Sequence, residues 1–242
     1  MKTIRIFFLV LVVMLAGCKN ANNSVPSKRI TEINVQSIDD EGFSYGYKIH
    51  YDEQDRITKI VPDNSEIFGI TEVEYGEGTF KIGKEDNYTS CLLNADGYIS
   101  DTKEDNFIAL FPGSMHYNDK GQLKSIKFSQ VQEMLFEWKG GNMVESNFED
   151  QKAVFTYTDI ENKNNFSFLL RIDAENCSVV FPYFELLGKP TKHLVASVEQ
   201  EGYGAKYEYK TDAEGFVDEL KMIYSTNGVE DSNIITYKFV YE

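Results

Sequence analysis

The segment Tyr47-Lys-Ile-His-Tyr-Asp-Glu-Gln-Asp-Arg-Ile-Thr-Lys-Ile60 has the pattern of a strand, a polar turn and a second strand. The segment Ser114-Met-His-Tyr-Asn-Asp-Lys-Gly-Gln-Leu-Lys-Ser-Ile126 repeats it closely. In both, an aromatic residue precedes Asp or Asn, a turn residue follows at +4, and aliphatic residues follow at +6 and +9. Looser copies occupy residues 93–99, 138–144 and 209–217.

The turn in the second copy explains the pattern. Asn118-Asp119-Lys120 suits a type I turn, and Gly121 supplies the positive φ that the following bulge needs. Asp55 and Asn142 stand where other copies have Gly, and Asp and Asn tolerate that conformation better than other residues. The spacing is not a strict solenoid period, so the sequence predicts successive antiparallel hairpins.

These hairpins locally resemble the YD repeats of large toxin-encapsulating shells, although five hairpins are too few to build a shell. Over most of the chain the Tyr-Asp/Asn-x-x-Gly hairpins and the segment Leu187-Gly188-Lys189 resemble a different group. These are Gram-negative envelope lipoproteins of a domain-of-unknown-function family with a porin-like fold. This resemblance implies a broad, curved antiparallel sheet that approaches a barrel. It brings no catalytic residues, because the family has no established activity.

We therefore expect an all-β fold, a large curved antiparallel meander, open or closed and barrel-like. A single domain covers residues 29–242, and a non-repeat insert covers residues 162–196. Within the insert, Val180, Phe184 and Leu187 fall at helical spacing before Gly188, which predicts one or two short helices.

The N-terminus predicts the compartment. Lys2 and Arg5 precede an apolar run, and Leu15-Ala16-Gly17-Cys18 matches a bacterial lipobox. Residues 1–17 are thus a predicted lipoprotein signal peptide, Cys18 the lipidated residue, and residues 18–28 a flexible tether. Lys19 after the cysteine fits sorting to the outer membrane, so we expect a lipid-anchored envelope protein.

A barrel could also span the membrane. The C-terminal strand places Ile235, Tyr237, Phe239 and Tyr241 on one face, as outer-membrane barrels often do. Spanning strands, however, need about 9–11 residues with a whole apolar face. Charges interrupt most strands here, and a lipid anchor would be redundant, so we expect a barrel in water.

Charge and cysteines constrain the partners. The formal net charge is −15, and −17 once Lys2 and Arg5 are removed, which disfavours nucleic acid as a partner.

Cys91 and Cys177 are expected to lie in an oxidising compartment, so they either form a disulfide or stay as two separate buried thiols. Neither Cys91 nor Cys177 has a basic neighbour in the sequence that would lower its pKa and make it a catalytic nucleophile.

No catalytic, metal or cofactor motif is evident in the sequence. His50 and His116 occupy equivalent hairpin positions and would share a metal only if their hairpins were adjacent, and His193 falls in the insert. Acidic clusters at 39–41 and 52–55 lack EF-hand spacing and are expected to be turns. We therefore predict no catalytic residues, no metal and no cofactor, and we leave the ligand-binding residues unassigned.

Three classes of function remain. The leading one is a non-catalytic binding or interaction lipoprotein whose partner is an envelope protein, a glycan or a lipid. The second is a carrier that holds an apolar or glycan ligand in the concave face of the sheet. The third is a glycan-acting hydrolase, which would need a carboxylate pair in a cleft.

Overall fold

The structure, a computed structural model, describes residues 28–38, 44–64, 70–84, 87–102, 113–128, 130, 132–166 and 186–242. These residues form sixteen β-strands. In chain order the strands are β1 (Ile30–Ile38), β2 (Ser44–Tyr51), β3 (Ile57–Pro62), β4 (Thr71–Gly76), β5 (Thr79–Lys84), β6 (Asn87–Leu93), β7 (Ile99–Thr102), β8 (Gly113–Tyr117), β9 (Leu123–Lys127), β10 (Glu133–Lys139), β11 (Asn142–Phe148), β12 (Gln151–Glu161), β13 (His193–Gln200), β14 (Tyr203–Thr211), β15 (Val217–Thr226) and β16 (Val229–Tyr241).

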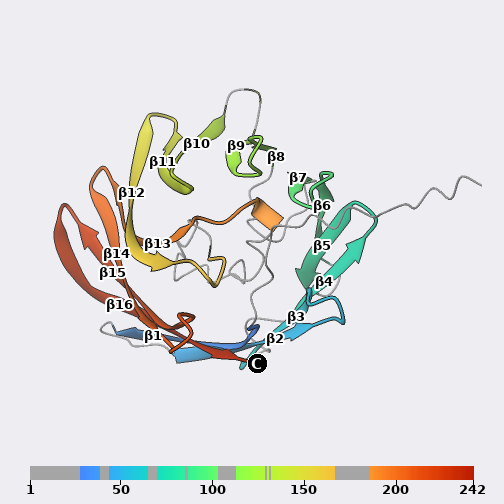
Figure 1. Cartoon of the computed structure of the whole chain (residues 1–242), viewed down its shortest axis with the longest axis horizontal. Helices are drawn as coiled ribbons and strands as arrows, with labels where there is room; N and C mark the ends of the chain where they lie inside the picture. Colours follow the sequence, from blue (N-terminus) through green and yellow to red (C-terminus); the bar gives the residue numbers. More distant parts are fainter. Residues whose placement is uncertain are drawn as a thin grey trace, which may run out of the picture.

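Each strand pairs antiparallel with the next, and β16 pairs with β1 to close a barrel. Figure 1 shows this ring, with the two ends of the chain's fold meeting where β1 lies beside β16. The closing register runs from Ile30 opposite Tyr241 to Ile38 opposite Ile234. The expected antiparallel meander is therefore confirmed, and it is closed. Closure leaves no unpaired sheet edge, which removes the usual route to edge-to-edge association.

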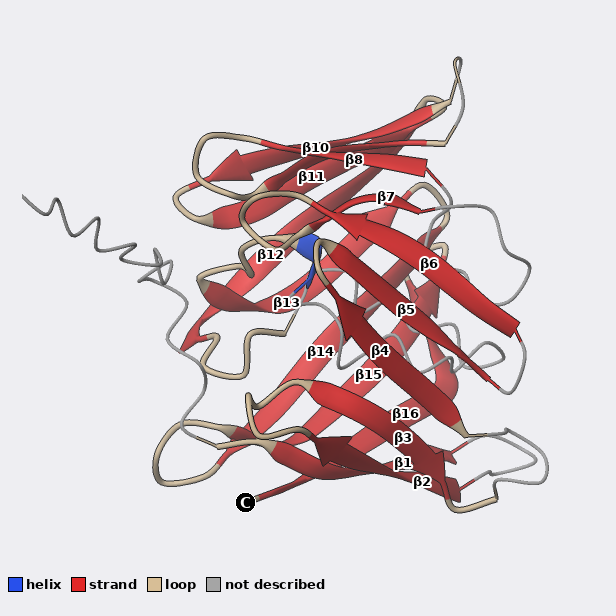
Figure 2. Cartoon of the chain, turned by 90° about the vertical axis from the view of Figure 1, so that its right-hand side faces the viewer, coloured by secondary structure: helices blue, strands red, loops and turns tan. Residues whose placement is uncertain are grey.

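The strands cross the barrel obliquely from one rim to the other, as Figure 2 shows. Such a tilt is required when a sheet closes on itself. Helix is confined, in the described residues, to a short 3₁₀ turn at Leu186–Leu187. The helices predicted around Val180 and Phe184 fall outside the described residues. None of the described helices has the length and apolar character needed to cross a membrane.

The two faces of the barrel wall differ in chemistry because side chains alternate along each strand. Inward positions are apolar and form one continuous core. Core members with no exposed area include Phe80, Ile99, Leu123, Ile126, Met143, Val217, Leu220, Met222 and Ile235. Outward positions are mostly polar and exposed, and many are charged, although Leu92, Leu135, Val154 and Val240 are exposed there too. The charged ones include Lys48, Glu72, Glu74, Lys81, Glu137, Lys206, Glu208, Lys210 and Lys238.

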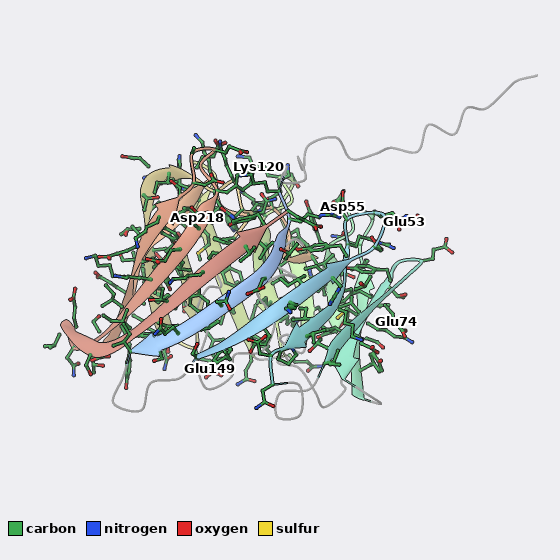
Figure 3. All side chains as sticks on the ribbon, turned by 90° about the horizontal axis from the view of Figure 1, so that it is seen from below. Glu53, Asp55, Glu74, Lys120, Glu149 and Asp218 are labelled. Atoms are coloured by element: carbon green, nitrogen blue, oxygen red, sulfur yellow. The ribbon has the colours of Figure 1, made fainter. Side chains whose placement is uncertain are left out.

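Charges on the outer face pair across neighbouring strands. Lys210 on β14 lies 2.6 Å from Glu219 on β15, and Lys152 on β12 lies 2.5 Å from Glu145 on β11. Figure 3 shows Glu74 and Asp218 projecting outward from the wall. The aromatic C-terminal strand obeys the same rule, because Tyr237 and Phe239 are buried inside while Lys238 is exposed outside.

The predicted hairpins are present, with one correction at β10–β11. The sequence pattern gave Asn142 the positive-φ role in that turn. Gly140 and Gly141 take it instead, with φ of 61° and 90°, and Asn142 begins β11. A two-residue turn with both central residues at positive φ matches the twist of a hairpin, so the paired glycines make a bulge at Asn142 unnecessary.

Candidate functional site

The candidate site is the rim at which the even-numbered strands end, which we call the short-turn rim. It contains the turns at residues 52–56, 77–78, 94–98, 118–122, 140–141 and 212–216, together with the start of β1 and the end of β16. The insert between β12 and β13 enters from the same rim. Figure 3 shows Glu53, Asp55 and Lys120 toward this end of the barrel and Glu149 toward the other.

Four turns of this rim share one hydrogen-bond pattern. In the turn of Asn118, the side-chain oxygen Oδ1 accepts hydrogen bonds from the backbone N–H groups of Lys120 (2.9 Å) and Gln122 (3.1 Å). Asp52, Asn94 and Asp212 do the same with residues +2 and +4. The residue at +3 has positive φ in every case: Asp55, Gly97, Gly121 and Gly215. The acidic cluster at 52–55 is thus a turn on an exposed rim, as predicted.

A second repeated feature fixes the rim to the wall. An aromatic side chain near the end of an even strand donates a hydrogen bond to a carbonyl near the start of the preceding strand. Tyr117 donates to Ile99 (2.7 Å), and Trp138 Nε1 donates to Leu123 (2.7 Å). The same contact joins Tyr51 to Ile30, Tyr157 to Met143, Tyr209 to Val195 and Tyr241 to Val217. Burial raises the phenol pKa of Tyr117 and Tyr209 well above the ordinary value, so both remain donors.

The first residues of the body are held on this rim by ion pairs. Lys28 Nζ lies 2.6 Å from Asp212 and 3.0 Å from Glu214, both in the β14–β15 turn. Arg29 lies 2.6 Å from Asp55 and 2.5 Å from Glu242. The chain that precedes the barrel therefore meets it at the short-turn rim.

The insert begins with a turn that shares the +4 hydrogen bond and the positive φ at +3 with these four turns. Asn162 Oδ1 accepts from the N–H of Phe166 (2.9 Å), and Asn165 at +3 has φ of 55°. Asn162 also donates to the Thr191 carbonyl (3.1 Å), which ties the two ends of the insert together. The sequence analysis missed this turn, although the spacing of Asn162 and Asn165 matches that of Asp52 and Asp55.

From this turn the insert contacts the rim on both sides. On one side Asn164 Oδ1 accepts from the N–H of Val217 on β15, and its amide donates to Tyr241 on β16. On the other side the Lys189 N–H donates to the carbonyl of Gly121 (2.8 Å), which lies in the turn between β8 and β9. The described ends of the insert thus connect rim segments that lie several strands apart in the barrel order.

The described ends of the insert each bury an apolar side chain. The ring of Phe166 packs 5.1 Å from that of Phe239 on β16, and Leu187 is 4 % exposed within the core. Phe166 and Leu187 are therefore part of the barrel core.

Within the residues that the structure describes, three carboxyls have a clearly shifted pKa, and in all three, Asp52, Asp212 and Glu219, it is lowered. For Asp212 the main cause is the hydrogen bond from Lys28, and for Glu219 it is the hydrogen bond from Lys210. For Asp52, hydrogen bonds from Arg56 and from the backbone outweigh the opposing effect of desolvation. A general acid would need the opposite shift.

The histidines are dispersed. His50 lies on β2 and His116 on β8, which are separated by five strands in the barrel order. His193 begins β13, and its Nδ1 lies 3.1 Å from the Asn142 amide at the start of β11, while its N–H donates to Asn142 Oδ1. The described residues contain no group of three or more side chains suited to hold a metal.

The cysteine predictions are tested only at Cys91. Cys91 is a buried thiol on β6, and burial raises its pKa to about 12, so it is not an activated nucleophile. Cys18 and Cys177 lie outside the described residues, and their lipidation and disulfide pairing stay predictions.

The comparisons with known proteins support the fold. No protein-family model matches the chain, and no curated protein matches it. A crystal structure of a porin-like protein from Bacteroides uniformis is similar, with a TM-score of 0.66 at 15% identity. The alignment covers 88% of this chain and 96% of that one. The porin-like barrel expected from the sequence is therefore shown as a fold.

Proposed function

We propose that this protein is a lipid-anchored envelope protein whose barrel stands in water as a non-catalytic binding module. Acylated Cys18 holds it to the membrane, and the outer membrane is the proposed location. The partner is an envelope protein, a glycan or a lipid, bound outside the barrel core. The observation that carries the proposal is the chemistry of the two faces of the wall.

A barrel that spans a membrane alternates apolar side chains toward lipid with polar side chains toward the lumen. This barrel has the reverse order, with Leu220 and Met222 inside and Lys206 and Lys238 outside. A lysine facing lipid at the bilayer midplane costs about 2–4 kcal/mol. Because several strands carry such charges on their outward faces, inserting the barrel wall into a lipid bilayer would be strongly unfavourable. An N-terminal lipid would supply the membrane attachment that the wall cannot.

Acyl labelling and phase partitioning distinguish membrane attachment through acylated Cys18 from attachment through the barrel wall. The full chain is expressed in a Gram-negative host fed an alkynyl fatty acid, and the protein is partitioned between aqueous and detergent phases. We expect the label on the natural chain and recovery in the detergent phase. Residues 19–242 placed behind an ordinary cleavable signal should carry no label and enter the aqueous phase. A matched Cys91→Ala variant should keep the label.

Two results would contradict the proposal. If residues 19–242 remain in the detergent phase, the wall itself contacts lipid. If the natural chain carries no fatty acid, Cys18 is not an anchor.

A carrier is the second candidate, because the inner face of the barrel and the buried Phe166 and Leu187 of the insert are apolar. Native mass spectrometry of the mature protein from its host periplasm tests it. A reproducible extra mass that disappears on denaturation would indicate a retained ligand and identify its class. If the native mass equals that of the chain alone, no ligand is retained, and binding on the outside of the barrel would be favoured. The denatured mass also tests the pairing of Cys91 with Cys177, because a disulfide lowers it by two hydrogens.

A further inference from the structure

Two pairs of lysines are brought together where the insert returns along the short-turn rim. The Lys189 N–H donates to the Gly121 carbonyl, which places Lys189 beside the turn that carries Lys120. The Lys192 N–H donates to the Gly141 carbonyl (3.0 Å), which places Lys192 beside the turn that follows Lys139. The four side chains are exposed. We call Lys120, Lys139, Lys189 and Lys192 the lysine arc.

The arc differs from the cations near the start of β1 and in the β2–β3 turn. Lys28, Arg29 and Arg56 are each paired with rim carboxylates at 3.0 Å or less. Across the described part of the chain, no ion pair involves a lysine of the arc. Asp119 is the nearest acid in the sequence, next to Lys120. In a protein with a formal net charge of −15, these four exposed lysines gather positive charge on one part of the rim.

The arc also lies on the rim from which the chain leads back to the predicted anchor. Lys28 is held at this rim, and Cys18 lies ten positions before it in the sequence. Fully extended, that tether spans roughly 35 Å at most, so the predicted anchor stays within this distance of the short-turn rim. The arc lies on the same rim but across the ring from Lys28, at the β8–β9 and β10–β11 turns.

We propose that the lysine arc contacts the anionic headgroups of the membrane to which Cys18 anchors the protein, and so sets the orientation of the barrel. This proposal rests on the anchoring proposed above. Each lysine held near an anionic bilayer raises the membrane partition coefficient about fivefold, and the effect vanishes beyond a Debye length of roughly 10 Å. A barrel that stands on the short-turn rim would bring the arc within this range of the headgroups.

Lysine labelling tests the orientation in the acylated full-length mature protein. The protein is incorporated into phosphatidylcholine vesicles with or without phosphatidylglycerol and treated briefly with an anionic acetylating reagent. Mass spectrometry then gives the rate at each lysine. An anionic surface lowers the local concentration of a singly charged anion about threefold. We expect labelling of the arc to fall at least about threefold in the anionic vesicles, and high salt to restore it.

Matched variants identify the cause. Lys189→Gln/Lys192→Gln should restore labelling of Lys120 and Lys139 in anionic vesicles, because two of the four attractive charges are removed. Lys206→Gln/Lys238→Gln removes two exposed lysines from the outer wall and should leave the protection of the arc unchanged.

The outcomes separate the two proposals. Failure of the mature protein to carry acyl chains would contradict the proposed anchoring. An anchored protein whose arc lysines react equally in both vesicle types would overturn the orientation alone. Protection of Lys206 and Lys238 in place of the arc would overturn it as well, because the wall would then face the membrane.

Discussion

The inner and outer faces of β14, β15 and β16 share one backbone but are stabilised by different physics. Inside, Leu220, Met222 and Ile235 have no exposed area, and burial of each contributes about 1.5–3 kcal/mol. Outside, Lys210 and Glu219 pair at 2.6 Å with the lysine 72% exposed, and such pairs contribute at most about 1 kcal/mol. The core therefore accounts for most of the stability, while the charged outer face favours water over lipid around the barrel.

The largest expected effect is on the inner face. Leu220→Ala should lower the free energy of unfolding by about 3–4 kcal/mol, through lost burial and the cavity that remains. Lys210→Ala on the outer face should change it by no more than about 0.5 kcal/mol. Urea denaturation of both variants measures the contrast. Equal losses would contradict the assignment of the two faces.

The second prediction asks whether the core extends into the insert. Gly188 has φ of 94°, and a Cβ there would lie 2.7 Å from the Gly121 carbonyl oxygen and 2.8 Å from the Tyr117 ring. Gly188→Ala should therefore cost about 2–3 kcal/mol, from backbone strain and overpacking together.

Gly78 provides the matched control for this substitution. It has φ of 64° with open space around its Cβ position, so Gly78→Ala should cost only the backbone strain of about 1 kcal/mol. Denaturation midpoints compare the two. If both variants lose the same amount, the insert does not pack against the rim.

The third prediction concerns the aromatic contacts between rim and wall. Tyr209 donates to the Val195 carbonyl at 2.8 Å, so Tyr209→Phe leaves a partly buried acceptor without this donor. We expect a loss of about 1–1.5 kcal/mol in the free energy of unfolding. Tyr203 is 63% exposed, and Tyr203→Phe should have no measurable effect. A null result at Tyr209 would show that water replaces the phenol there.

The hairpins could be predicted from sequence because their information is local. Asn118 and Gly121 fix one turn through a side-chain acceptor and a positive φ. The register shift next to this turn then lets Leu123 and Ile126, three residues apart, both face the core. The error at Asn142 has the same local origin. Gly140 and Gly141 precede it and offer a shorter turn that competes with the bulged one.

Closure and the rim contacts could not be predicted in this way. The pairing of β1 with β16 joins Ile33 to Phe239, which are about as far apart in sequence as the fold permits. The lysine arc likewise depends on Lys189 meeting Gly121 through one backbone hydrogen bond, which no spacing rule encodes. The sequence partly predicted that charged side chains would face water, because charges interrupt the strands. Which face of each strand lies inside the barrel could be assigned only from the closed structure.

The smallest expected effect lies at the junction between tether and rim. The hydrogen bond from Lys28 lowers the pKa of Asp212 below its ordinary value near 3.8. Because the folded pKa is depressed, the pair stabilises the fold above about pH 3.8, and this contribution is lost as the pH falls through the folded pKa. Asp212→Asn keeps an Oδ1 acceptor for the N–H groups of Glu214 and Phe216 and removes only the charge. The natural protein should therefore exceed the variant slightly in denaturation midpoint at pH 7, and the difference should shrink to zero on acidification below pH 3.8. A difference independent of pH would show that the turn matters at Asp212 and its charge does not, and the tether would then be held at the rim chiefly through Arg29.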